Sequence, residues 1–146
     1  MKISIFGLGY VGCVGAACLA KLGHRVVGVD VNENKVRLIN EGKPTIIEEG
    51  IAELCAEAHS KGLMSATMDV REAVCRESDV LVVTNKEKEF AELLARYPNK
   101  TVVDLVRQWK EVDYSGHYEG LSWGDINTNR QGQKASITQD FWQTEF

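Results

Sequence analysis

Residues 2–12 read KISIFGLGYVG, and this stretch predicts the fold of the chain. The apolar run Lys2–Phe6 is typical of a short buried strand, and a helix rich in small residues follows Gly12. A second apolar run begins at Arg25 and ends in Asp30. Strand, G-x-G-x-x-G, helix, strand and acid, in this order, are the fingerprint of a dinucleotide-binding βαβ unit.

Each glycine of the motif has its own physical reason. Gly7 permits the tight turn out of the strand, Gly9 lets the backbone approach a pyrophosphate, and Gly12 lets the helix pack against the strand. The helix N-terminus then directs free N–H groups and the positive end of its dipole at the phosphates. The alternative is a glycine-rich turn of an α/β fold that binds no ligand.

Asp30 predicts which dinucleotide binds. At the end of the second strand, its carboxylate is placed to accept hydrogen bonds from the adenosine ribose diol. The same carboxylate repels a ribose 2′-phosphate, so we expect NAD rather than NADP.

Length and composition limit the function classes. The 146 residues suit one domain with its own core, and 44% hydrophobic and 26% charged residues are typical of a globular chain. The net charge of −4 argues against nucleic acid or an anionic membrane as partner. No apolar run is long enough to cross a bilayer, and glycines interrupt the N-terminal apolar stretch. The expectation is a cytoplasmic protein.

Strands and helices alternate along the chain, which predicts an α/β fold: a single Rossmann-like, doubly wound parallel sheet of about six strands. Helices are expected at residues 11–22, 32–42, 51–61, 69–75 and 87–97. Strands are expected at residues 2–6, 25–31, 64–67, 80–83, 101–106 and 119–123. Residues 124–146 read as a polar, loosely held tail. Its Phe141–Trp142 pair either anchors on the body or another subunit, or belongs to a frayed terminus.

No catalytic or metal-ligating residue is assigned from spacing. The four cysteines (Cys13, Cys18, Cys55 and Cys75) have neither a metal-type spacing nor a disulfide framework. Cys13, at a helix start, has a position that lowers a thiol pKa, but a packing role is favoured for it.

Longer stretches resemble the UDP-glucose/GDP-mannose dehydrogenase family, with the GDP-mannose 6-dehydrogenase branch nearest. The first part carries KISIFGLGYVG, GVDVNENKVRLINEGKPTIIEEGI and GLMSATMDV. The second part carries SDVLVVTNKEKEF, KTVVDLV and YEGLSW, which are similar to the last strands of the family's C-terminal domain. The resemblance thus implies a Rossmann-like domain over residues 1–123, composed of 1–77 and 78–123, with 124–146 as a tail.

The resemblance also implies cofactor-binding residues. Besides the three glycines and Asp30, it assigns the backbone N–H groups of Tyr10 and Val11 to the phosphates and Lys35 to the ribose or phosphate edge. Thr84 and Asn85 follow the fourth strand, where open α/β sheets bind ligands. Asn85 stands where the family's first domain has proline, as expected if this strand resembles the other domain.

The family's reaction is an NAD-dependent oxidation of a sugar C6 alcohol to a carboxylate through a cysteine thioester. The cysteine loop, of G-F-G-G-S-C type, and the lysine, asparagine and glutamate of the middle region are absent from these 146 residues. We therefore expect an NAD-binding domain without independent catalysis. The alternatives are a non-enzymatic interaction or regulatory module and a small NAD-dependent oxidoreductase. A nucleotide sugar and a second copy of the chain stay open as further partners.

Overall fold

The fold is described from a computed structural model, for residues 1–69, 78–86, 88–94, 96–107, 114 and 116–120. Residues 70–75 of the helix expected at 69–75, the strand end expected at 121–123 and the tail lie outside these residues. No helix in the described part is long and apolar enough to cross a membrane.

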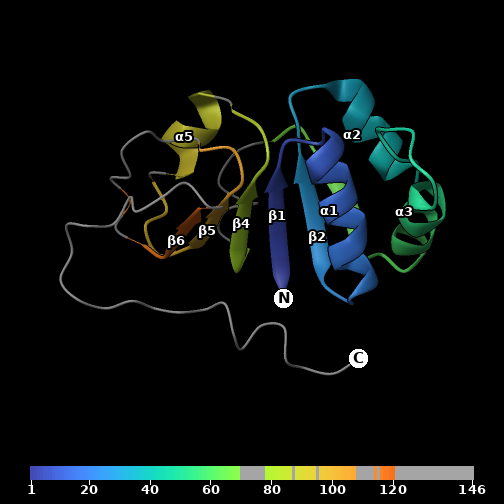
Figure 1. Cartoon of the computed structure of the whole chain (residues 1–146), viewed down its shortest axis with the longest axis horizontal. Helices are drawn as coiled ribbons and strands as arrows, with labels where there is room; N and C mark the ends of the chain where they lie inside the picture. Colours follow the sequence, from blue (N-terminus) through green and yellow to red (C-terminus); the bar gives the residue numbers. More distant parts are fainter. Residues whose placement is uncertain (70–77, 87, 95, 108–113, 115, 121–146) are drawn as a thin grey trace.

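The described strands form one six-stranded sheet in the order β3-β2-β1-β4-β5-β6, and every neighbouring pair is parallel (Figure 1). The bounds are β1 Lys2–Phe6, β2 Arg25–Val29, β3 Met64–Thr67, β4 Val80–Val83, β5 Thr101–Asp104 and β6 Tyr118–Gly120. This confirms the predicted doubly wound α/β fold. The strand order reverses between β1 and β4, and ligands of such sheets bind beyond the strand ends at that point.

The helices lie where the connections between parallel strands require them. Their bounds are α1 Tyr10–Lys21, α2 Glu33–Asn40, α3 Ile51–Ser60 and α5 Lys88–Leu94. Asn32 caps α2, because its side-chain oxygen accepts hydrogen bonds from the backbone N–H groups of Asn34 and Lys35. Figure 1 shows α1, α2 and α3 grouped beside β1 and β2, and α5 on the far side of β4.

Two apolar clusters, one on each face of the sheet, hold the fold together. Ile3 and Ile5 of β1 pack with the small residues of α1 and with α3. Phe6 points to the opposite face and packs with Leu81 of β4 and Leu94 of α5. Alternate residues of β1 thus pack into different clusters, as expected for a sheet that is covered on both faces.

Two strands end earlier than the sequence predicts. The expected ends were Val31 and Val106, but β2 ends at Val29 and β5 at Asp104. In both places an aspartate carboxylate accepts a hydrogen bond from the backbone N–H two residues later, at 2.9 Å, which turns the chain out of the strand. The strand β6 begins one residue earlier than expected, at Tyr118.

Candidate dinucleotide-binding site

The turn after β1 needs glycine at its first position. Gly7 has a φ of +101°, which disfavours any residue with a side chain. A Cβ atom there would lie 2.7 Å from the Cβ atom of Asn85 and 3.0 Å from Oγ1 of Thr84. The Gly7 N–H donates to the carbonyl of Val29 at 2.8 Å, so the turn is tied to the end of β2.

The other two glycines of the motif have opposite surroundings. A Cβ atom on Gly12 would lie 1.9 Å from the carbonyl oxygen of Gly7, so α1 packs directly against the turn. A Cβ atom on Gly9 would meet no atom within 4 Å. Gly9 is therefore not needed for packing within the chain, and the space above it is free for a ligand.

The N-terminus of α1 is built to receive an anion. Gly9 is the N-cap residue and offers no side-chain hydrogen bond, and the first turn contains no acidic residue. The backbone N–H groups of Tyr10 and Val11 belong to this first turn, and both side chains are about half exposed. Such a helix end attracts a phosphate through its N–H groups and its dipole.

Asp30 lies at the end of β2, beside the glycine turn. One carboxylate oxygen accepts from the backbone N–H of Leu8 at 2.7 Å and from Nζ of Lys35 at 3.0 Å, and the other accepts from the N–H of Asn32 at 2.9 Å. Burial by itself raises the pKa of this carboxyl, but the two backbone hydrogen bonds and the Lys35 ammonium outweigh it and hold the pKa below its ordinary value. Asp30 is thus an anion that orients the turn.

Lys35 brings a positive charge to the same place. Its side chain is one third exposed, and its ammonium forms the ion pair with Asp30. An ammonium has three donors, and the ion pair uses one of them. The remaining donors are available to a ribose hydroxyl or phosphate oxygen next to Asp30.

Thr84 and Asn85 follow β4 and lie against the glycine turn, as the sequence predicts for the carboxyl end of this strand. The Thr84 hydroxyl donates to the carbonyls of Phe6 at 3.0 Å and of Gly7 at 2.8 Å. In this structure Thr84 therefore supports the turn between β1 and α1.

The loop 41–50 also reaches the site, although the sequence alone does not predict these contacts. The Thr45 hydroxyl donates to the carbonyl of Leu8 at 2.8 Å, and the Tyr10 hydroxyl donates to the Glu48 carboxylate at 3.0 Å. This carboxylate raises the pKa of Tyr10. The signal for this contact in the sequence is the acidic pair Glu48–Glu49.

Two exposed apolar residues, Val31 and Met68, lie near Asp30, and the sequence alone does not identify them as part of the site. Val31 is 51% exposed and Met68 is 49% exposed. They follow the ends of the paired strands β2 and β3, where the N–H of Asp30 donates to the carbonyl of Thr67. Their signal in the sequence is an apolar residue one or two positions after each strand, and together they offer an apolar surface beside Asp30.

The described cysteine, histidine and acidic residues do not form a metal site. No group of three or more His, Cys, Asp or Glu residues in the described part of the chain could hold a metal ion. Cys13 and Cys55 are buried in the cluster between α1 and α3. A hydrogen bond from the Cys55 thiol lowers the pKa of Cys13 to about 6.

Comparisons with known proteins agree with this geometry. Residues 1–89 match the NAD binding domain of the UDP-glucose/GDP-mannose dehydrogenase family. The GDP-mannose 6-dehydrogenase of Pseudomonas aeruginosa is 51% identical over 80 residues, which cover 55% of this chain and 18% of that protein. The UDP-glucose 6-dehydrogenase AglM of Haloferax volcanii is 42% identical over 83 residues, covering 57% of this chain and 19% of that protein.

Solved structures give the same result. A ternary complex of GDP-mannose dehydrogenase from Pseudomonas aeruginosa superposes with a TM-score of 0.62 at 37% identity, covering 71% of this chain and 28% of that one. A UDP-glucose dehydrogenase from Pyrobaculum islandicum gives 0.61 at 33% identity, covering 70% and 28%. The chain thus spans less than a third of the length of these relatives. It belongs to the UDP-glucose/GDP-mannose dehydrogenase family, and residues 1–89 are an NAD binding domain of that family.

Proposed function

We propose that this chain binds NAD at the carboxyl edge of β1, β2 and β4 and does not oxidise a sugar by itself. The pyrophosphate lies over Gly9 and the backbone N–H groups of Tyr10 and Val11. The observation that carries the proposal is the free space above Gly9, next to a helix N-terminus that has no side-chain cap.

Asp30 and Lys35 hold the adenosine ribose in this proposal. A carboxylate has about four acceptor positions, and three described donors already use it. One acceptor position therefore remains for a ribose hydroxyl, and Lys35 donates to the second hydroxyl. The same buried carboxylate disfavours the 2′-phosphate of NADP.

Thr84 and Asn85 face the other half of the cofactor. They lie next to Gly7, on the β4 side of the point where the strand order reverses. When bound, NAD supplies a hydride acceptor. We assign no catalytic residue to this chain, because its sequence lacks the cysteine motif that the family resemblance implies.

The relatives are named for nucleotide sugars, so a nucleotide sugar is the substrate class that we propose for an assembly containing this domain. We also propose that the residues of 78–123 that lie beyond the matched stretch 1–89 derive from the C-terminal domain of such an enzyme. The motifs KTVVDLV and YEGLSW, which resemble the last strands of that domain, support this.

Calorimetric titration of the purified chain with NAD, and in parallel with NADP, tests the proposal. Saturable binding of NAD with weaker binding of NADP is the expected result. Gly9→Val is the matched variant, because its side chain enters the proposed phosphate space and its Cβ atom meets no atom of the chain within 4 Å. Equal binding of NAD by Gly9→Val and the original chain would refute the assignment. Turnover of NAD with UDP-glucose or GDP-mannose would favour the oxidoreductase alternative.

A further inference from the structure

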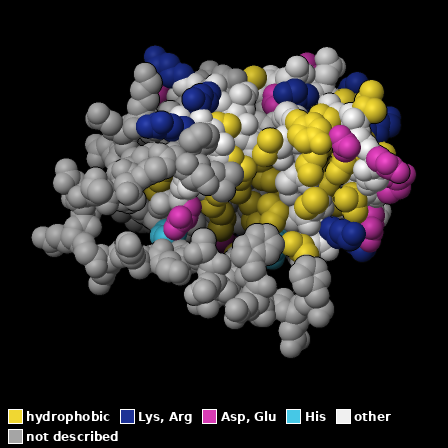
Figure 2. Space-filling view, viewed as in Figure 1, with side chains coloured by type: hydrophobic (Ala, Val, Ile, Leu, Met, Phe, Trp, Pro, Cys, Tyr) yellow, Lys and Arg dark blue, Asp and Glu magenta, His cyan; other side chains and the backbone are white. Residues whose placement is uncertain are grey.

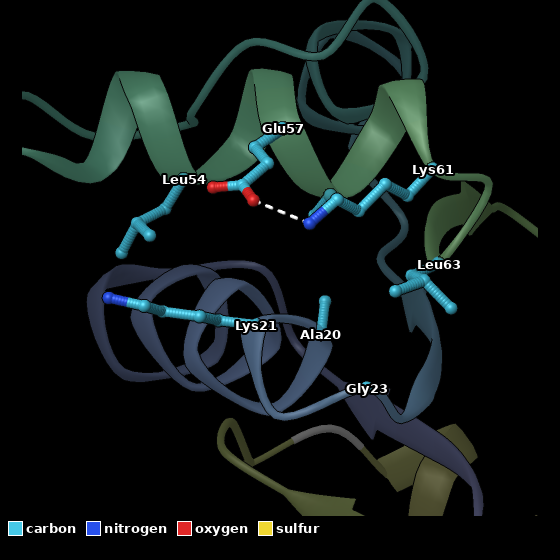
Figure 3. A pocket seen from close by; sticks show the side chains of 8 residues that line it. Ala20, Lys21, Gly23, Leu54, Glu57, Lys61 and Leu63 are labelled. Atoms are coloured by element: carbon cyan, nitrogen blue, oxygen red, sulfur yellow. Dashed lines mark hydrogen bonds and ion pairs between the residues drawn. The ribbon is translucent and has the colours of Figure 1, made fainter.

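A small pocket lies between the C-terminal end of α1 and the helix α3, so it is at the opposite end of α1 from the glycine turn (Figure 3). Its volume is about 110 Å³. Ala20, Leu54, Ala58 and Leu63 provide apolar walls. For comparison, an apolar cavity of roughly 150 Å³ holds a benzene ring. An open pocket of this size therefore accommodates part of one aromatic ring.

The rim of the pocket carries excess positive charge. Lys21, Lys61 and Glu57 lie around it, and Lys61 pairs with Glu57 at 2.6 Å. Figure 3 shows this pair on α3 and the Lys21 side chain extending along α1. The pKa of Glu57 is lowered mainly by Lys61 and only slightly by the charge of Lys21. The single carboxylate is thus engaged by Lys61, and the charge of Lys21 remains available to an acidic partner.

The exposed side of α1 carries an apolar strip of its own. Val11, Gly15, Cys18 and Leu22 recur at helical spacing on the side opposite the buried residues, and Leu22 is 73% exposed. A solvated helix carries polar residues on such a face. Figure 2 shows hydrophobic side chains gathered over α1 and the strands beside it. Leu22 ends this strip and is the sequence neighbour of Lys21 and Gly23, which line the pocket.

We propose that the segment Asp140–Glu145 of this same chain docks here, with Phe141 or Trp142 in the pocket and the acidic residues on Lys21 and Lys61. The sequence DFWQTE places two adjacent aromatic residues between two acids. This composition matches an apolar pocket with a basic rim. Aromatic anchors in small pockets commonly dominate such contacts.

The chain is long enough to reach the pocket. From β6 to β2 the sheet is crossed in four strand spacings, roughly 19 Å, and one strand length adds about 17 Å. A layer spacing of about 10 Å brings the path to roughly 46 Å. The residues between Gly120 and Phe141 span up to about 70 Å when extended. Docking within one chain therefore needs no stretched connection.

Tryptophan fluorescence tests the proposal on the full chain. The sequence has three tryptophans, and Trp109→Phe with Trp123→Phe leaves Trp142 as the reporter. We expect its emission to lie at shorter wavelength than that of free tryptophan amide, with weaker quenching by acrylamide. Adding Lys21→Glu should abolish this shielding, and adding Asp140→Lys as well should restore it. Lys88→Glu, an exposed change on α5 at the other side of β4, should leave the shielding unchanged.

Three results would overturn the proposal. Trp142 quenched like the free amide would show that it is not docked, and shielding unaffected by Lys21→Glu would place it elsewhere. Shielding that disappears on dilution together with a dimer would assign the surface to a second copy. If the reporter variant does not fold, carbodiimide cross-linking of the unchanged chain decides. The Lys61–Glu57 ion pair is the internal control of this cross-linking experiment. The expected product joins Lys21 or Lys61 to Asp140 or Glu145. If this product does not form, the proposed contact is refuted.

Discussion

Replacing Asp30 by asparagine tests two proposed roles of this side chain, which are stabilising the glycine turn and binding NAD. Asparagine has nearly the same shape, but it carries no charge and only one of its two terminal atoms accepts hydrogen bonds. In the folded chain one carboxylate oxygen faces the donors of Leu8 and Lys35, and the other faces the N–H of Asn32. Either orientation of the amide therefore leaves at least one backbone N–H opposite an NH₂ group.

The expected loss of stability follows from the one backbone N–H that is left without an acceptor. A buried donor left without an acceptor costs about 1–3 kcal/mol, so Asp30→Asn should lower the free energy of unfolding by about that amount even without NAD. The variant Lys35→Met is the matched comparison, since it removes only the partly exposed ion pair. Its cost should stay below about 1 kcal/mol.

Urea unfolding at pH 7, with and without NAD, measures both effects. Asp30→Asn should be less stable in each condition and should gain less from NAD than the original chain does. The pH dependence adds a check. Because the folded pKa of Asp30 is depressed, its contribution is complete above the unfolded pKa of about 3.9 and is lost as the pH falls through the lower folded value. The difference in the free energy of unfolding between Asp30→Asn and the original chain should therefore become smaller in that acid range.

Two results would contradict this reasoning. If Asp30→Asn unfolds with the original free energy, the hydrogen bonds of its carboxylate do not hold the turn. If it binds NAD with the original affinity, Asp30 does not contact the ribose. Losing NAD binding without losing stability would show that the residue acts on the ligand alone.

Three further substitutions give sharp expectations. Gly9→Val should retain the stability of the original chain while losing NAD, as chemical unfolding and calorimetry would show together. Gly12→Ala should lower the free energy of unfolding by about 1–3 kcal/mol, because its Cβ atom would lie 1.9 Å from the carbonyl oxygen of Gly7; full stability would refute the close packing of α1. Tyr118→Phe removes the hydrogen bond to buried Asp104 and should cost about 1.5–3 kcal/mol. The pKa of Tyr118 is raised by burial and by Asp104, so the stability that this tyrosine contributes is complete below pH ~10 and is lost as the pH rises further. Between pH ~10 and higher values, the free energy of unfolding should therefore fall less steeply with pH for Tyr118→Phe than for the original chain.

The sequence predicted the fold well because its strongest signals are local. The glycine motif, the spacing to Asp30 and the continuous apolar run of β4 each follow from a few neighbouring residues. The early ends of β2 and β5 could not be predicted in the same way. Apolar residues continue to Val31 and Val106, and the turn at each aspartate becomes visible only from its side-chain hydrogen bond.

The site was predicted in part for the same reason. Gly7, Gly9, Gly12 and Asp30 lie together as the motif indicates. The contacts from the loop 41–50 join residues far apart in the sequence, such as Leu8 and Thr45, and no periodicity reports them. The pairing of Lys35 with Asp30 was likewise invisible, because the sequence places Lys35 near the ribose without showing which group its ammonium contacts.

The described parts of the two halves of the sheet show why we propose a dinucleotide site in the first half. Strand β5 follows β4 as β2 follows β1, and each second strand ends in an aspartate that turns the chain. Asp104 is fully buried, and its other oxygen accepts the Tyr118 hydroxyl at 2.5 Å, so this carboxylate is used inside the fold.

Asp30 instead adjoins the partly exposed Lys35, and its turn contains the glycines that residues 84–89 lack. Without the glycines of such a turn, an acid at the end of a second strand is a structural residue. With them, the same acid lies where a ribose can reach it.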